Sequence, residues 1–234
     1  MTEVHCVLFT SFRMQTGALT GFSAKSLPTN VHIGLQMPST PGAKTVTVNG
    51  DYLYFHYGCD GLDDRGWGCG YRTVQTLASW LFHNCDLPKG RHMLAPSLPD
   101  MQRALVSLGD KPEHFSGSRD WIGTVEAALV LDYFYEVPCK IAHLRGHFER
   151  QGSPVMMGGG ADNSSKGVLG VCSAEGHDGS SLLIVDPHYY GVQRDRAELQ
   201  RQAWVSWTRI SSLDHSSFYN LCLPQTGNIR QTLK

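Results

Sequence analysis

The 234-residue sequence has no excess of charge, no long apolar run and no signal peptide. Its 20 Lys and Arg residues balance 21 Asp and Glu residues, which argues against a nucleic-acid binder because such proteins carry a basic excess. No apolar stretch approaches the roughly 18 residues of a membrane span, so we expect no direct membrane insertion. The N-terminus lacks a basic region followed by an apolar core. We therefore expect a cytoplasmic protein.

The cysteines also lack the spacing of a disulfide framework or a zinc site. The seven cysteines lie at positions 6, 59, 69, 85, 139, 172 and 222, with no Cys-x-x-Cys pair. The number is odd and no short-spaced cluster occurs, so we expect reduced thiols and neither a metal nor another cofactor. His143 and His147 are four residues apart, but no third ligand is evident, and we expect them on a solvated surface.

Hydrophobic residues make up 41% of the chain, enough for one packed domain. Residues 1–44 are rich in Ser, Thr, Gly and Pro, and we expect a loosely ordered lead-in followed by a domain over residues 45–234. The patterns predict a hairpin or two edge strands at 45–48 and 52–55, and helices starting near 69, 97 and 122. Later strands are predicted near 139–144, 154–157, 168–172, 182–185, 203–210 and 221–223, with a glycine-rich loop from Gly158 to Gly167. Helices precede strands, which predicts an α+β fold with a helical layer on a mostly antiparallel sheet.

Two of these elements carry finer predictions. Ser97 and Asp100 have the spacing of a capping box at the start of the second helix. The third helix, over residues 122–134, is expected to bury the face formed by Ile122, Val125, Leu129 and Tyr133.

Cys69 is the cysteine with the most distinctive surroundings. It lies in the glycine-dense sequence Asp-Arg-Gly-Trp-Gly-Cys-Gly-Tyr-Arg, at the point where a helix is predicted to start. A helix N-terminus presents unpaired N–H groups and the positive end of the dipole, which favour the reactive thiolate and can stabilise an oxyanion. The alternative is a tight turn around a buried, inert thiol.

The sequence Asp186-Pro187-His188 follows a predicted buried strand. Side chains at positions i and i+2 of a strand share a face, so the Asp186 carboxylate can orient the His188 imidazole. A cysteine nucleophile needs such a base and such an orienting group. The alternative is a strand exit with a surface histidine. A second oxyanion donor is also needed, and the hydroxyl of either Tyr54 or Tyr57 can serve, unless both are core aromatics.

Four motifs together resemble the ubiquitin-fold modifier-specific proteases, a family of papain-like cysteine proteases. They are Gly-Trp-Gly-Cys-Gly-Tyr-Arg at 66–72, Asp-Pro-His at 186–188, Tyr57 ahead of the cysteine, and Pro-Val-Met-Met-Gly-Gly-Gly at 154–160. The likeness covers roughly residues 45–225 and leaves residues 1–44 and 194–202 without a role.

The resemblance implies a papain-like fold with Cys69 as nucleophile, His188 as base, Asp186 as its partner and Tyr57 as oxyanion donor. It implies cleavage after the C-terminal glycine of a ubiquitin-fold modifier, which would mature its precursor or release it from conjugates. We expect a monomeric enzyme whose partners are the modifier precursor and the modifier conjugates. A narrow glycine-selective channel is expected from Gly66, Trp67, Gly68, Met157, Gly158 and Gly159, with the segment 158–160 as a mobile flap.

Two other functions remain open at this point. The autophagy cysteine proteases also combine a Gly-Trp-Gly-Cys loop with an Asp-Pro-His box, and they act on a different ubiquitin-like modifier. A catalytically weak adaptor that only binds the modifier is the alternative outside enzymes, although such a protein would usually have lost the cysteine or the histidine.

Overall fold

The computed structural model describes residues 27–88, 93–140, 144–160, 164–173, 180–191, 195–214 and 216–227. The helices are α1 (Cys69–Asn84), α2 (Leu98–Ser107), α3 (Thr124–Tyr135), α4 (Leu144–Arg150) and α5 (Arg196–Arg201), with short 3-10 turns at Glu113–Phe115 and Ile210–Ser212. The strands are β1 (Lys44–Thr47), β2 (Cys139–Lys140), β3 (Val155–Gly159), β4 (Ser165–Ser173), β5 (Ser181–Val185), β6 (Val205–Arg209) and β7 (Tyr219–Pro224).

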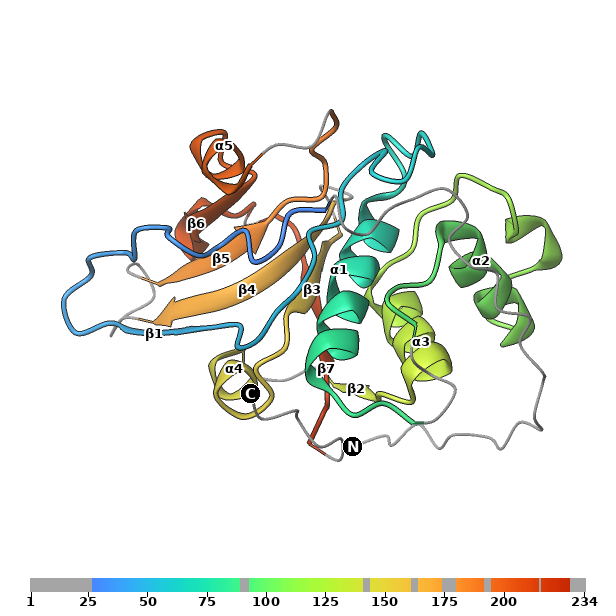
Figure 1. Cartoon of the computed structure of the whole chain (residues 1–234), viewed down its shortest axis with the longest axis horizontal. Helices are drawn as coiled ribbons and strands as arrows, with labels where there is room; N and C mark the ends of the chain where they lie inside the picture. The colour runs from blue at the N-terminus through green and yellow to red at the C-terminus, as the bar shows by residue number, and fades with distance from the viewer. Residues whose placement is uncertain are drawn as a thin grey trace.

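The strands form one antiparallel sheet in the order β2-β7-β3-β4-β5-β6. β3 pairs with the first half of β4 and β1 with its second half, so β1 continues the same edge of β4. Figure 1 shows α1 between this sheet and the α2–α3 pair, while α4 lies apart from those helices. This layered arrangement confirms the α+β prediction. None of the helices in the described ranges is long and apolar enough to cross a membrane.

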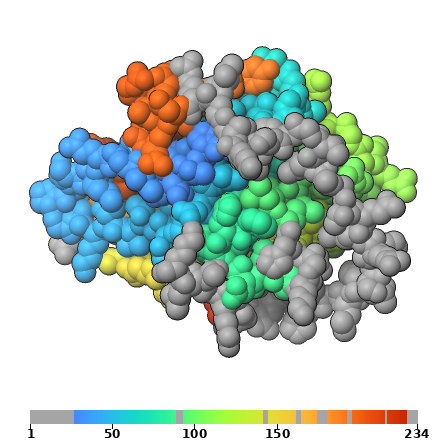
Figure 2. All heavy atoms as spheres, viewed as in Figure 1, coloured from blue at the N-terminus to red at the C-terminus, as the bar shows by residue number. Residues whose placement is uncertain are grey.

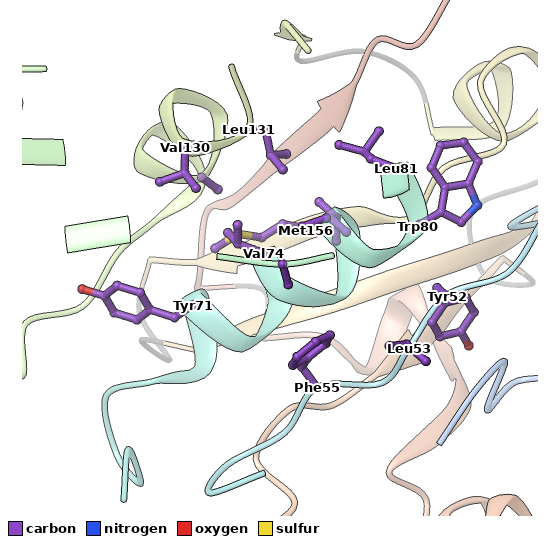
Figure 3. Packing of buried hydrophobic residues seen from close by; sticks show 14 of the residues in the cluster. Tyr52, Leu53, Phe55, Tyr71, Val74, Trp80, Leu81, Val130, Leu131 and Met156 are labelled. Carbon is purple, nitrogen blue, oxygen red and sulfur yellow. The ribbon is translucent and has the colours of Figure 1, made fainter. Parts of the chain in front are cut away.

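Side-chain alternation divides the sheet between two apolar cores. Met156, Leu183 and Val185 face the main core around α1, whereas their neighbours Val155, Met157, Leu182 and Ile184 face a second core that includes Phe148 of α4. A period of two places adjacent residues of a strand on opposite faces. Figure 3 shows α1 inside the main core, with Tyr71, Val74 and Leu81 directed toward its neighbours.

The segment before α1 packs along that helix instead of forming the predicted hairpin. The amide of Leu53 donates to Ser79 Oγ at 2.9 Å and that of Phe55 to Thr76 Oγ1 at 3.1 Å. These helix hydroxyls replace the strand partners that a hairpin would supply, and β1 pairs with β4. The hairpin prediction is therefore wrong. The strand predicted at 45–48 is present as β1, whereas within residues 52–55 only Leu53 forms a bridge, with Thr29.

Residues 27–44 belong to the packed molecule, although we assigned them to a lead-in. Leu27 and Val31 are buried in the main core, and Figure 2 shows this blue segment spread over one face of the protein, next to the orange α5. Packing therefore begins before residue 45. Residues 1–26 lie outside the described residues.

Three further predictions need correction, and one is confirmed. The Ser97–Asp100 capping box is present, with the Asp100 amide 3.2 Å from Ser97 Oγ. On α3, however, Val125 is 67% exposed, and the buried residues are Ala127, Val130, Leu131, Phe134 and Tyr135. The helix has apolar side chains on most of its circumference, so the spacing of apolar residues alone could not select its buried face.

The other two corrections concern the second half of the chain. The strand predicted at 139–144 is limited to β2 at residues 139–140, and α4 starts at Leu144. Within the predicted loop from Gly158 to Gly167, residues 158–159 belong to β3 and residues 165–167 to β4, and Gly158 pairs with Ser165 on one side and Asn220 on the other. Residues 161–163 lie outside the described residues. A segment hydrogen-bonded on both sides does not form a mobile flap.

Candidate active site

Cys69 is the first residue of α1 and is buried at the junction of the helix and the sheet. The glycines on either side of it are required by close packing. A Cβ on Gly68 would lie 1.9 Å from Asp64 Oδ2, and a Cβ on Gly70 would lie 2.4 Å from the Ile122 carbonyl oxygen. Both contacts are shorter than any real Cβ contact, so these positions bring the start of α1 against its neighbours because they have no side chain.

A buried ion cluster fixes the loop that leads to Cys69. Arg72 Nε lies 2.8 Å from Asp64 Oδ2, and both side chains are fully buried. Arg72 also binds Asp60 through two nitrogens, each at 2.8 Å. Asp64 in turn accepts the Gly58 amide at 2.8 Å. The charges pair with one another and with backbone donors, so the cluster ties the loop over residues 58–68 to the first turn of α1.

His188 and Asp186 follow β5 and bind each other directly. His188 Nδ1 lies 2.5 Å from Asp186 Oδ1, which also accepts the His188 amide at 3.0 Å. The second oxygen of Asp186 pairs with Lys166 Nζ at 3.2 Å. Burial alone would raise the pKa of Asp186, but these cationic partners hold it below its usual value. The carboxylate therefore stays charged and orients the imidazole.

Cys69 and His188 form a hydrogen-bonded pair whose charges support each other. Burial opposes the imidazolium, but the bonds to Asp186 and Cys69 outweigh it and raise the pKa of His188 to about 9. Burial likewise opposes the thiolate, but hydrogen bonds from His188, the Ser165 backbone and Tyr57 lower the pKa of Cys69. The geometry thus favours a thiolate–imidazolium pair at neutral pH, the reactive form of a cysteine nucleophile.

The structure separates the two candidate oxyanion donors. The Tyr57 hydroxyl is hydrogen-bonded to Cys69 and accepts the Gly66 amide, and burial together with the nearby thiolate raises its pKa, so it stays a protonated donor. The Tyr54 hydroxyl instead donates to the Asp186 carbonyl oxygen at 2.5 Å. Only Tyr57 is therefore placed at the nucleophile.

A groove with a volume of about 190 Å³ ends at Cys69. One wall comes from the loop that enters α3, and the other comes from the ends of β3, β4 and β7. Its lining residues are Cys69, Trp121, Ile122, Gly123, Thr124, Gly158, Gly159, Gly160, Ser164, Ser165 and Asn220. Because three consecutive glycines on one wall have no side chains, an extended chain with small side chains can lie close to the backbone of that wall.

Two of the six predicted channel residues, Gly158 and Gly159, line this groove. Trp67 does not, because its ring packs on Tyr71 in the main core, with centroids 5.5 Å apart. Met157 is in the second core, on the opposite face of β3.

Gly66 and Gly68 have other roles than lining the groove. Gly68 packs over Asp64, and Gly66 reaches the groove only through its carbonyl, which accepts a 2.9 Å bond from Trp121 Nε1.

Sequence reasoning missed the wall formed by residues 121–124. Trp121 is 48% exposed, although α3 starts only three positions later, at Thr124. An aromatic residue at this place reads as a core residue from sequence, and no motif distinguished it. The Asp64–Arg72 pair was also missed, since its eight-residue spacing matches no local helix or strand rule.

The histidine pair considered for metal binding is only partly described. His143 lies outside the described residues, and His147 is buried in α4 with Nε2 3.0 Å from both Ser153 oxygens. The expectation of a solvated surface is wrong for His147, because its ring is buried and bonds to Ser153, which lies between α4 and β3. Within the described ranges, no three His, Cys, Asp or Glu side chains are grouped to hold a metal.

Comparisons with known proteins agree with this geometry. The model of peptidase family C78 matches residues 43–222. The chain is 48% identical to Ufm1-specific protease 1 of Mus musculus, over 86% of this chain and 95% of the relative. It is 37% identical to Ufm1-specific protease 2 of the same species, over 85% of this chain but 44% of that longer protein.

A solved structure shows the same fold. The crystal structure of UfSP from C. elegans superposes with a TM-score of 0.69 at 31% identity, covering 86% of this chain and 38% of the other. A nucleophile at a helix start opposite a histidine on the sheet is the papain-like arrangement. The geometry of the site therefore agrees with the family that the comparisons indicate. The chain belongs to peptidase family C78.

Proposed function

We propose that this protein is a cysteine protease that cleaves after the C-terminal glycine of a ubiquitin-fold modifier. The observation that carries the proposal is the joint placement of Cys69, His188, Asp186 and Tyr57 at the end of a glycine-walled groove. The relatives named Ufm1-specific proteases support the choice of modifier. The same chemistry acts on a precursor extension and on an isopeptide-linked conjugate, because both have an amine bonded to the terminal glycine.

The proposed reaction has two steps. The Cys69 thiolate attacks the glycine carbonyl carbon, and the resulting oxyanion accepts a hydrogen bond from the Tyr57 hydroxyl. The carbon–nitrogen bond then breaks as His188 gives its proton to the departing amine. Water next attacks the thioester and transfers a proton to His188. The carbon–sulfur bond breaks and gives the modifier carboxylic acid, which loses its proton to water, together with the original thiolate–imidazolium pair.

The groove accounts for the requirement for glycine. Gly158, Gly159 and Gly160 form one wall, and a Cβ on Gly158 would already touch Thr124 across the groove at 3.5 Å. A bulky residue beside the scissile bond would therefore collide with the walls. The terminal residues of the modifier can enter in an extended conformation and place the last carbonyl at Cys69.

The proposal includes a monomeric enzyme in the cytoplasm. Size-exclusion chromatography with light scattering tests the first point, and fractionation of cells expressing the tagged chain tests the second. A dimer or a membrane-bound fraction would refute the respective part without affecting the chemistry.

The decisive experiment combines a cleavage assay with a covalent trap. Purified full chain is incubated with modifier precursor, and the product mass identifies the cleaved bond. In parallel, the ubiquitin-fold modifier, ubiquitin and the autophagy modifier are each supplied with a C-terminal propargylamide. We expect cleavage after glycine and covalent labelling by the ubiquitin-fold modifier alone.

Matched variants complete this test. Cys69→Ser should abolish cleavage and labelling while binding of the precursor persists, and Cys139→Ala, a thiol change outside the site, should retain both. Labelling by the autophagy modifier instead would favour the autophagy-type activity. Binding without cleavage in the unmodified chain would favour the adaptor.

A further inference from the structure

Arg65 and Tyr190 meet at the surface near the catalytic pair. The guanidinium carbon of Arg65 lies 4.3 Å from the centre of the Tyr190 ring, which is cation–π geometry. Arg65 comes from the loop before α1, and Tyr190 follows His188 by two residues. The Tyr190 residue is 50% exposed and the Arg65 side chain is 55% exposed. A contact between the two halves of the site is therefore open to solvent.

The backbone places this contact on the His188 side of Cys69, away from the groove. Tyr190 forms a parallel bridge with Tyr57, and its ring covers Gly58, where a Cβ would lie 2.5 Å from it. Arg65 directly precedes Gly66, whose amide bonds the Tyr57 hydroxyl. The groove is lined by none of these residues. The Arg65–Tyr190 contact is thus connected to the oxyanion donor and the base and is not part of the groove wall.

The chemistry of the bond assigns different occupants to the two sides. The groove receives the acyl part, the tail that ends in glycine. The leaving amine must lie against His188, since His188 supplies its proton. A chain that continues beyond the amine then passes Tyr190 and Arg65. On the basis of the proposed function, we propose that Arg65 and Tyr190 form a ledge that binds the aliphatic part of the residue carrying the leaving amine.

The charges at the ledge suit an amine that leaves neutral and takes a proton from water to become a cation. Asp63 lies 2.8 Å from Arg65 Nε and 2.7 Å from Arg65 Nη2, so the Arg65 charge is compensated. Asp60 and Asp64 are engaged by Arg72. The ledge therefore carries little net charge to repel a lysine ammonium, and the aromatic ring offers a surface for its methylene groups.

The test compares substrates that share the acyl part and differ in the leaving group. One is the modifier C-terminal methyl ester, whose leaving group is too small to reach the ledge. The second has a peptide extension, and the third has a peptide linked through a lysine ε-amine. Modifier propargylamide reports the reactivity of Cys69 separately. The variants are Tyr190→Ala and Tyr190→Phe, which removes only the hydroxyl.

We expect Tyr190→Ala to raise KM for the extended substrates by roughly five- to thirty-fold, the usual effect of truncating an interface tyrosine. Ester hydrolysis and propargylamide labelling should stay within about two-fold of the parent enzyme, and Tyr190→Phe should resemble the parent on all substrates. A loss limited to the isopeptide would identify lysine methylenes as the occupant. A similar loss on both amine substrates would show that the ledge accepts either source.

Two results would overturn the proposal that Arg65 and Tyr190 bind the leaving residue. An equal loss on the ester and the extended substrates would mean that the ring only supports Tyr57, and an unchanged KM would mean that the leaving residue does not touch it. Failure of the parent enzyme to react with the propargylamide would instead refute the proposed function, and the ledge with it. A thermal unfolding midpoint near that of the parent confirms that Tyr190→Ala is folded.

Discussion

The rings of Tyr57 and His188 meet edge to face, with centroids 5.2 Å apart and planes at 84°. Their backbones explain the contact, because the Tyr57 amide donates to the carbonyl of Pro187 at 3.0 Å. The segment that carries the oxyanion donor is thus hydrogen-bonded to the segment that carries the base. The donor and the base keep a fixed distance because they share this backbone connection.

Tyr57→Phe should therefore lower kcat by about 10²- to 10³-fold, because it removes the hydroxyl and leaves the ring in place. KM for the precursor should change little, and steady-state kinetics will separate the two parameters. Tyr54→Phe is the matched control, since that hydroxyl binds the Asp186 carbonyl and not the nucleophile. A wild-type rate for Tyr57→Phe would assign Tyr57 to packing.

The activity should follow a bell-shaped pH profile. The rate rises as Cys69 loses its proton, at a pH below the ordinary thiol value. It falls near pH 9, where His188 loses the proton that the leaving amine needs. Measuring kcat/KM for the precursor from pH 5 to 10 checks both limbs. An alkaline limb near the ordinary histidine pKa would contradict the ion pair.

Asp186→Asn should shift the alkaline limb to lower pH, because the carboxylate is what favours the charged imidazole. The rate at the optimum should also fall, by up to about 10⁴-fold, since asparagine does not hold the ring in the required tautomer. Lys166→Gln keeps the carboxylate and removes only its outer partner, and it should cause a far smaller loss. Equal effects of the two substitutions would show that the Asp186 carboxylate is not what orients His188.

Gly158→Val should raise KM by obstructing the groove at the point where it faces Thr124. Alkylation of Cys69 by iodoacetamide should keep its rate, because that reagent is small and needs only the thiolate. Gly227→Val provides a control at a glycine whose Cβ would meet only the Gln151 side chain. An unchanged KM would place the modifier tail outside the groove.

Arg72→Met should destabilise the fold by about 3–5 kcal/mol, because it leaves the Asp64 charge buried without its cation. The exposed Arg145–Glu149 pair on α4 supplies the control, and Arg145→Met should cost less than about 1 kcal/mol. Urea unfolding followed by tryptophan fluorescence measures both. Similar losses of unfolding free energy in the two variants would mean that the buried cluster contributes no more to stability than an exposed ion pair.

The parts of the site that sequence could predict are those set by local rules. Cys69 at a helix start follows from the rules for helix ends. Asp186 and His188 do meet two residues apart after a buried strand, but through a turn in which Asp186 Oδ1 accepts the His188 amide and not through the strand alternation that we assumed. The choice of Tyr57 over Tyr54 as oxyanion donor does not follow from local rules, since it depends on which of the two hydroxyls donates to the Asp186 carbonyl oxygen. Trp121 reaches the groove only through the packing of α3 beside α1.

The errors in the fold have the same origin. Residues 52–55 follow a turn signal and are apolar like a strand. However, the amides of Leu53 and Phe55 bond to hydroxyls of α1, a partner that a strand pattern does not reveal. Val125 fits a helical stripe that other apolar residues of α3 satisfy equally well. Gly158 and Gly159 have low strand propensity, yet β4 and β7 pair with them on both sides, so tertiary pairing overrides propensity.

The nucleophile and its base belong to different layers of the molecule, Cys69 to α1 and His188 to the sheet. A chain with its helices formed but its layers apart keeps only the effect of the helix N-terminus on the thiol, because the hydrogen bonds from His188, Ser165 and Tyr57 exist only after docking. The reactivity of the Cys69 thiol therefore reports the packing of the helical layer against the sheet rather than the formation of α1. In newly made protein, Cys69 reaches its full reactivity only when the two layers have packed together.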